Sequence, residues 1–150
     1  RVRQPAVIKK AGEYLYFMTG GRYTLQSASY GRRLFAVDGM QRRTSEKEWS
    51  SGLGDQIYLA VRVALAMAFA GQIESMPLIL DDILVRFDEV RQKEALRFLA
   101  DLGKTEQVFL FTCSEETRRL AVEVQKELAG ETDSVHLFEI SKGTIEAKGV

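Results

Sequence analysis

The sequence predicts an α/β domain in which helices flank a mostly parallel sheet, with a small antiparallel meander near the N-terminus. After residue 76, short apolar runs alternate with amphipathic helical patterns, and this strand–helix order is typical of parallel sheets with right-handed crossovers. Before residue 48, runs of β-forming residues flank turn signals, which indicates antiparallel strands. The chain has 150 residues and is 45% hydrophobic, enough to bury a core.

The first 48 residues predict one helix and the meander. Apolar residues recur at spacings of three and four from Ala6 to Met18, which places them on one helical face. Thr19-Gly20-Gly21 should end that helix. Residues 23–28 and 34–37 should form strands on either side of a turn at Ser29-Tyr30-Gly31.

A long apolar helix should follow the serine pair Ser50-Ser51. Its longest apolar run, Ile57 to Ala70, is interrupted by Arg62 and is shorter than the roughly 20 apolar residues that cross a bilayer. We therefore expect a buried helix and no membrane span.

The rest of the chain supplies the parallel sheet and a terminal hairpin. The strand at 77–81 is wholly apolar before its acids, as in strands buried on both faces of a parallel sheet. The later elements, in order, are a helix ending at Gly103, a strand at 107–112, a helix ending at Gly130, and a hairpin of 135–140 with 144–147.

Charge and cysteine content suggest the surroundings of the protein. Residues 1–48 carry an excess of Lys and Arg, and residues 76–150 an excess of Asp and Glu, so any attraction to nucleic acid should come from the front of the chain. Cys113 is the only cysteine and no leader pattern precedes the domain, which favours a cytoplasmic location. Because the chain begins at Arg1, within a helical pattern, we expect it to be part of a longer polypeptide.

Two acids, Asp81 and Asp82, follow the apolar strand directly, and a carboxylate at the edge of a core needs a cation or donors to stay charged. One could hold Mg²⁺ through water while the other orients an attacking water. Residues 112–114 and Asp88 should lie at or near the same edge of the sheet. The Ser-Gly pair that begins the long helix can offer a hydroxyl and N–H groups to an anion. Together they predict a site for a magnesium nucleotide.

These residues resemble the motifs of ABC-type ATPases. Trp49-Ser50-Ser51-Gly52 is similar to the signature motif, residues 78–82 to Walker B, and Phe87-Asp88 to the D-loop. The closest likeness is to the C-terminal lobe of SMC, SbcC and RecN-type heads, which is the C-terminal half of a P-loop NTPase head. Residues 19–23 and 55–62 look most like bacterial YhaN-type proteins.

The resemblance implies a role for each site residue. Ser50, Ser51 and Gly52 would bind the γ-phosphate of ATP held by a second head, and Asp88 would meet its counterpart across that homodimer. Asp81 would hold Mg²⁺, and Asp82 would stand where the family has the glutamate that positions the hydrolytic water. Residues 1–18 would be the end of a coiled-coil helix and 19–150 the ATPase lobe, serving DNA repair or chromosome maintenance with DNA and a nuclease subunit as further partners.

Three departures from the family pattern leave alternatives open. No Gly-x-x-x-x-Gly-Lys-Ser/Thr loop is present, so an N-terminal Walker A lobe of the same parent chain would be needed and the fragment alone should be inactive. Asp82 is one methylene shorter than glutamate. Cys113 and Ser114 stand where a switch histidine is expected. The alternatives are a non-catalytic head-dimerisation module and a stand-alone Mg²⁺-dependent phosphodiesterase using Asp81, Asp82 and Asp88.

Overall fold

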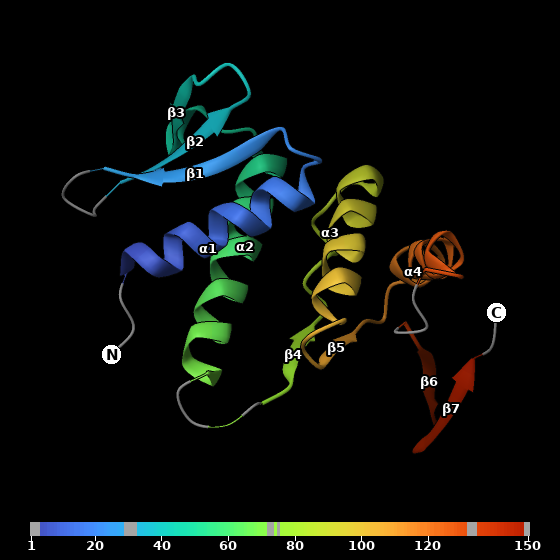
Figure 1. The fold of residues 1–150 in the computed structure, drawn as a ribbon. Coiled ribbons are helices and arrows are strands. Elements are labelled where there is room, and N and C mark those ends of the chain that lie inside the picture. Colours follow the sequence, from blue (N-terminus) through green and yellow to red (C-terminus); the bar gives the residue numbers. More distant parts are fainter. Residues whose placement is uncertain (1–3, 29–32, 72–73, 75, 132–134, 149–150) are drawn as a thin grey trace.

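The computed structural model describes residues 4–28, 33–71, 74, 76–131 and 135–148 (Figure 1). The elements in chain order are α1 (Gln4–Met18), β1 (Tyr23–Ser27), β2 (Leu34–Asp38), β3 (Arg43–Ser45), the 3-10 helix η1 (Glu46–Glu48), α2 (Ser51–Ala70), β4 (Leu78–Asp81), α3 (Glu89–Leu102), β5 (Val108–Phe111), α4 (Glu115–Leu128), β6 (Leu137–Ser141) and β7 (Thr144–Lys148). The α/β class and the meander near the N-terminus are confirmed.

The meander consists of β1, β2 and β3 in antiparallel order and packs beside α1 (Figure 1). Its third strand was not foreseen because Arg43-Thr44-Ser45 is polar and shows no apolar alternation. Leu25 and Ala36 pair across β1 and β2 and both are buried, so this face of the meander closes the core. The turn predicted at Ser29-Tyr30-Gly31 lies outside the described residues.

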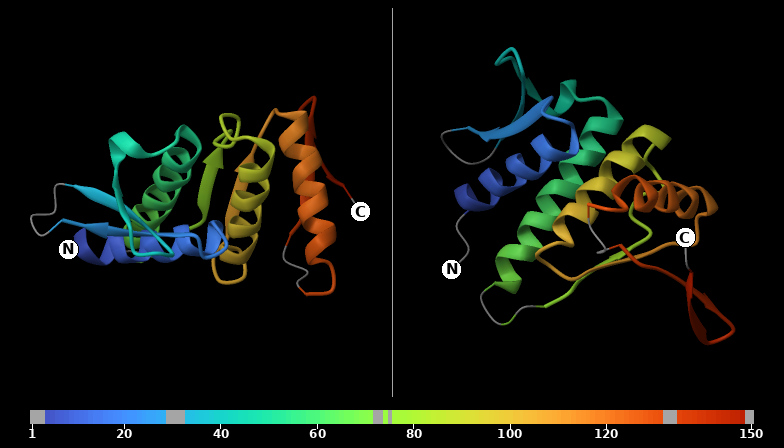
Figure 2. Two further views of the ribbon diagram at one scale, coloured as in Figure 1. Left: turned by 90° about the horizontal axis from the view of Figure 1, so that it is seen from above. Right: turned by 45° about the vertical axis from the view of Figure 1, so that its right-hand side comes forward.

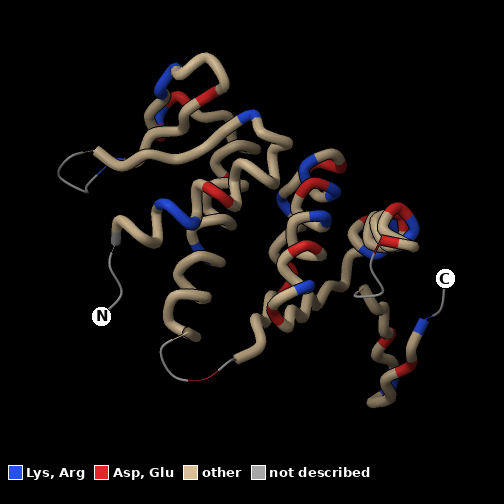
Figure 3. The backbone as a smooth tube through the Cα atoms, viewed as in Figure 1, with Lys and Arg blue, Asp and Glu red and all other residues tan. Residues whose placement is uncertain are grey.

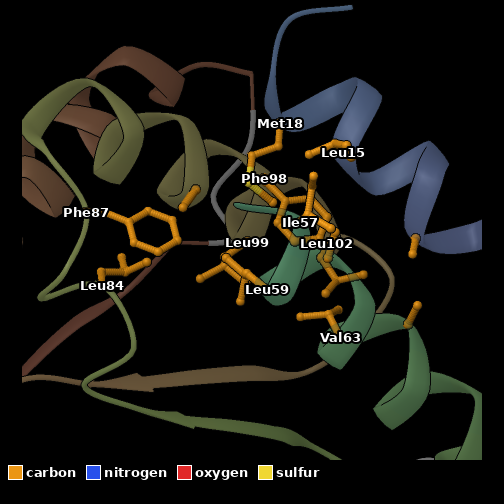
Figure 4. Close-up of a cluster of buried hydrophobic side chains, with 14 of the residues drawn as sticks. Leu15, Met18, Ile57, Leu59, Val63, Leu84, Phe87, Phe98, Leu99 and Leu102 are labelled. Carbon is orange, nitrogen blue, oxygen red and sulfur yellow. The ribbon is translucent and has the colours of Figure 1, made fainter. Parts of the chain in front are cut away.

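Helices α1, α2 and α3 supply most of the main core, and α4 adds Leu120 and Val124 to it. Figure 4 shows the cluster that they form, with side chains from α1 (Leu15, Met18), α2 (Ile57, Leu59, Val63), α3 (Phe98, Leu99, Leu102) and the loop before α3 (Leu84, Phe87). The rings of Tyr14 and Phe98 lie 5.1 Å apart and join α1 to α3. The apolar face that the sequence predicts for α1 is therefore a buried one, with Ala11, Leu15 and Met18 in the core.

The parallel part of the sheet is small, since β4 pairs only with β5. Leu78 and Leu80 belong to the side packed against the helical core, whereas Ile79 on the opposite face is 63% exposed and Phe109 and Phe111 are 41% and 43% exposed. The expectation that this strand is buried on both faces is therefore wrong. The physical reason is that the described part of the chain supplies helices for one face of the sheet only.

The C-terminal elements lie at the opposite end of the molecule from α1. Helix α4 packs on α3, and the hairpin of β6 and β7 stands apart from the helical core (Figures 1 and 2). The hairpin confirms the prediction, with register Ser141 to Thr144 next to its turn. Its strands do not pair with β4 or β5, so the described strands form three separate sheets.

Helix α2 begins at Ser51 and is 20 residues long, longer than the apolar run from Ile57 to Ala70. By length and composition alone it could cross a bilayer, because an 18-residue window has a mean hydropathy of 1.4. One of its faces is nevertheless part of the domain core, with Ile57, Ala60 and Val63 almost fully buried. A helix that packs in a domain core can have the same length and hydropathy as a membrane-spanning helix. The buried face of α2 agrees with the expectation of a core helix.

Candidate nucleotide site

The tip of α2 is open to solvent and retains polar groups for a ligand. Ser50 is the N-cap, and its Oγ accepts a hydrogen bond from the backbone N–H of Leu53 at 3.1 Å. Both Ser50 and Ser51 are exposed. The first N–H groups of a helix have no partner within the helix, and they lie at the positive end of its dipole. The tip can therefore bind an anion that approaches from outside the chain.

Asp88 is joined to the α2 tip through Arg91. Asp88 caps α3 by accepting the backbone N–H of Arg91 at 2.9 Å, and the Arg91 guanidinium donates to its other oxygen at 2.6 Å. These two bonds, the backbone one first, hold the pKa of Asp88 below its ordinary value. The same guanidinium lies against Gly52. A single arginine thus links the residue resembling the D-loop acid to the residues resembling the signature motif.

Asp81 and Asp82 stand at the carboxyl end of β4, as predicted. Asp81 is the last residue of the strand, pairs in register with Phe111 and is exposed. Asp82 turns the chain with a positive φ of 52°, a left-handed conformation that aspartate tolerates better than most residues. Its backbone N–H donates to the Phe111 carbonyl at 2.7 Å, and its carboxylate Oδ1 accepts the Thr112 hydroxyl at 3.0 Å.

A chain of hydrogen bonds continues from Thr112 toward α3. The backbone N–H of Ser114 donates to Thr112 Oγ1 at 3.0 Å, and Ser114 caps α4 by accepting the N–H of Thr117 at 3.2 Å. The buried hydroxyl of Thr117 donates to Gln92 Oε1 at 2.7 Å. Gln92 Nε2 in turn donates to the carbonyl of Phe87 at 3.1 Å. The edge that carries Asp82 is thereby connected to the residue before Asp88.

The donor set fits a magnesium ion held mainly through water. Carboxylates such as those of Asp81 and Asp82 are hard oxygen ligands, and Mg²⁺ usually keeps several waters and takes one or two carboxylates. The described residues include no group of three or more His, Cys, Asp or Glu side chains that could hold a metal together. Direct ligation by Asp81, Asp82 and Asp88 as a set is therefore not supported.

The sequence analysis did not single out three residues of this network, Arg91, Gln92 and Thr117. Gln92 falls on the apolar stripe of α3, three residues before Ala95, and a polar residue at a core position is a signal of a buried hydrogen bond. Arg91 follows Asp88 by three residues, the spacing at which helical side chains meet. That spacing predicts the ion pair, but the contact of Arg91 with Gly52 has no local signal.

Comparison with solved structures defines the class of fold. Over 97% of its length the chain superimposes on the SMC head domain from Thermotoga maritima, with a TM-score of 0.66, 15% identity and 47% of that chain covered. An SMC ATPase structure from work on ATP-driven dimerization and DNA stimulated activation gives a TM-score of 0.62 at 13% identity, covering 98% of this chain and 84% of that one. The chain has the fold of SMC ATPase head domains.

In sequence, the chain is similar to the uncharacterized protein YhaN of Bacillus subtilis, with 32% identity over 122 residues. That match covers 79% of this chain and 12% of the length of YhaN. No family model matches the chain. The resemblance to SMC-type heads, and to YhaN in particular, is confirmed, and the chain spans about an eighth of the length of this relative.

Proposed function

We propose that the chain is the C-terminal lobe of an SMC-like ATPase head that binds ATP between two heads and hydrolyses it. One observation carries the proposal. The same lobe has an exposed α2 tip at Ser50 and Ser51, which can accept an anion, and two acids, Asp81 and Asp82, at the end of β4. A hydrogen-bond network connects the surroundings of Asp82 with those of Asp88. Such a lobe can offer its tip to a neighbouring molecule's triphosphate while its acids serve a metal and a water.

The site residues take different parts in this proposal. Ser50, Ser51 and Gly52 would contact the γ-phosphate of a nucleotide carried by the second head. Asp81 would hold Mg²⁺ through its water shell, and the ion would neutralise charge on the phosphates. Asp82 would orient the attacking water and accept its proton. Asp88 would meet its counterpart in the second head, with its orientation fixed by Arg91.

A second part of the proposal is an N-terminal Walker A lobe of the same parent chain. The open face of the β4–β5 sheet exposes Ile79, Phe109 and Phe111, and burying such a face would stabilise an added layer. The pair of strands also leaves outer edges able to accept further strands. Residues 1–18 would be the end of a coiled-coil helix entering the head, and residues 19–150 the ATPase lobe.

We propose the cellular role of the protein from its structural similarity to SMC head domains. An SMC head is known bound to the C-terminal domain of ScpA, in a Pyrococcus furiosus complex that matches this chain with a TM-score of 0.54 at 14% identity, covering 95% of this chain and 34% of that one. We place the cycle in cytoplasmic DNA repair or chromosome maintenance, with a nuclease subunit as a further partner. Basic residues stand among acidic ones on the meander (Figure 3). The exposed Arg33, Arg42 and Arg43 in this part of the chain favour a surface that faces DNA.

ATP turnover by the complete head tests the proposal. The chain would be produced together with the N-terminal lobe of its parent, and hydrolysis measured with ATP and Mg²⁺ for the unmodified head, Asp81→Ala and Asp82→Ala. We expect turnover that falls at least about 100-fold in Asp82→Ala, the scale of a positioned general base. Turnover that survives Asp82→Ala would show that another group activates the water.

The second candidate function is a non-catalytic head-dimerisation module. Ser114 in place of the expected histidine and the short side chain of Asp82 favour it. An unmodified head that associates in the presence of ATP without hydrolysing it would establish this candidate and overturn the first. A metal-dependent nuclease assay on the same preparations tests the phosphodiesterase alternative.

A further inference from the structure

We propose that Thr112 is a positioning residue for Asp82, fixing the carboxylate in the direction from which it activates water. This inference rests on the proposed ATPase function and goes beyond it, since neither the sequence motifs nor the similar proteins assign a role to Thr112. Among the described residues, Thr112 supplies the only side chain that hydrogen bonds to Asp82. The two residues are 30 positions apart and meet only because β4 and β5 pair.

The direction of the Thr112 hydroxyl is set by its other partner. The backbone N–H of Ser114 donates to Thr112 Oγ1 at 3.0 Å, which occupies a lone pair of that oxygen. The hydroxyl proton is left to be donated, and the acceptor within reach is Asp82 Oδ1 at 3.0 Å. Thr112 therefore acts as a fixed donor toward the carboxylate.

The backbone of Asp82 is held at the same time. Its N–H donates to the carbonyl of Phe111 at 2.7 Å, and its φ of 52° lies in the left-handed region. A side chain on such a backbone, with one oxygen bonded to Thr112, has little freedom to rotate. Oδ1 is engaged, and Oδ2 accepts no hydrogen bond from the described residues. Oδ2 is thus the oxygen available to a water molecule.

This arrangement accounts for a short acid at position 82. A glutamate has one more rotatable bond, and it would need further contacts to hold its carboxylate still. Aspartate on a left-handed backbone needs only one directed donor, and Thr112 is that donor. Ser114, at one of the two places where a histidine is expected, contributes through its backbone N–H to Thr112 and through its cap of α4.

Steady-state kinetics of the complete head, with its N-terminal lobe, test the inference. Thr112→Val keeps the shape of the side chain and removes the hydroxyl, whereas Thr112→Ser keeps the hydroxyl. We expect Thr112→Val to lower kcat about ten-fold, the scale of one lost hydrogen bond to a charged group, with the KM for ATP unchanged. Thr112→Ser should retain kcat to within about two-fold, because the directed donor is preserved.

Each outcome decides for or against the inference. Normal kcat in Thr112→Val, together with an inactive Asp82→Ala, would overturn the role of Thr112 and leave the ATPase proposal standing. Equal losses in Thr112→Val and Thr112→Ser, or a raised KM at constant kcat, would also overturn it. An unmodified head without turnover would overturn both proposals. Thr112 is exposed, so thermal melting should confirm that the variants fold, and Thr112→Ala replaces Thr112→Val if the latter does not.

Discussion

The guanidinium of Arg91 occupies the space beside Gly52 that any side chain at position 52 would need. A Cβ on Gly52 would come within 2.5 Å of both Nε and Cζ of Arg91. Nε of Arg91 is buried there and has no hydrogen-bond partner among the described residues, while Nη1 donates to Asp88 at 2.6 Å. A side chain at position 52 would therefore displace the end of the flexible Arg91 side chain, so the surroundings of the α2 tip depend on α3.

Gly52→Ala should therefore disturb the proposed function more than the fold. Alanine stabilises a helix by up to about 1 kcal/mol relative to glycine, and displacing Arg91 from Asp88 loses an exposed ion pair of about 0–1 kcal/mol. The net change in the free energy of unfolding should stay within about 1 kcal/mol. ATP-dependent association of heads, measured by size-exclusion chromatography, should weaken because the Arg91 guanidinium must move.

Gly54→Ala is the matched control for this experiment. Gly54 lies on the same helix, and a Cβ there would meet no atom within 4 Å. We expect head association to be unchanged in this variant. Identical behaviour of Gly52→Ala and Gly54→Ala would contradict the role given to Arg91.

The buried amide of Gln92 should couple measurably to Thr117. Gln92 and Thr117 are each 1% exposed, and Gln92→Leu leaves the Thr117 hydroxyl and the Phe87 carbonyl without this partner. We expect a loss of about 2–3 kcal/mol in the free energy of unfolding, measured in urea. Adding Thr117→Val should cost less than the sum of the single changes, because it removes the orphaned hydroxyl. Strictly additive losses would show that the bond contributes nothing.

Glu127 should make the stability of the α3–α4 pair depend on acid pH. It accepts Arg97 Nε at 2.9 Å and lies 3.0 Å from Lys93, and these partners, Arg97 first, lower its pKa from 4.5 to about 2. Since the folded pKa is below the unfolded value, this stabilisation is present above about pH 4.5 and is lost as the pH falls through about 2.

Glu127→Gln tests the pH dependence. The carboxylate side chain is 39% exposed, so screening limits the expected loss at neutral pH to about 0.5–1 kcal/mol. The difference between the variant and the unmodified chain should shrink as the pH is lowered from 4.5 toward 2, as followed by urea unfolding. Glu131→Gln serves as the control, because Glu131 forms no ion pair with the described residues. A difference independent of pH would contradict the assignment.

A charge on the open face of the β4–β5 sheet should block association with the N-terminal lobe. Phe109 is already 41% exposed, so Phe109→Lys should leave the fold of the chain intact. The lysine ammonium would lose its water when the N-terminal lobe covers this face, at a cost of several kcal/mol. Co-purification of the two lobes should be lost, whereas Met40→Lys on the distant meander, at a residue 75% exposed, should leave it unchanged. Intact co-purification of Phe109→Lys would place the lobe elsewhere.

The sequence by itself determined most of the elements, because apolar periodicity and turn residues act over a few neighbours. The buried stripe of α1, the ends of α1 and α3 at glycines, and the C-terminal hairpin all follow from such local patterns. The sequence also predicted that Asp81 and Asp82 lie at the end of β4 and that Ser50 and Gly52 lie at the start of α2, since acids after an apolar strand and serines before an apolar helix are visible in the chain.

Only the tertiary structure decided how these residues are held. The bond from Thr112 to Asp82, the left-handed backbone of Asp82 and the contact of Arg91 with Gly52 join residues on different elements. They depend on how β4 pairs with β5 and how α3 lies against α2. The exposure of the sheet face around Ile79 was mispredicted for the same reason. The sequence of an apolar strand is the same whether or not another part of the chain covers its second face.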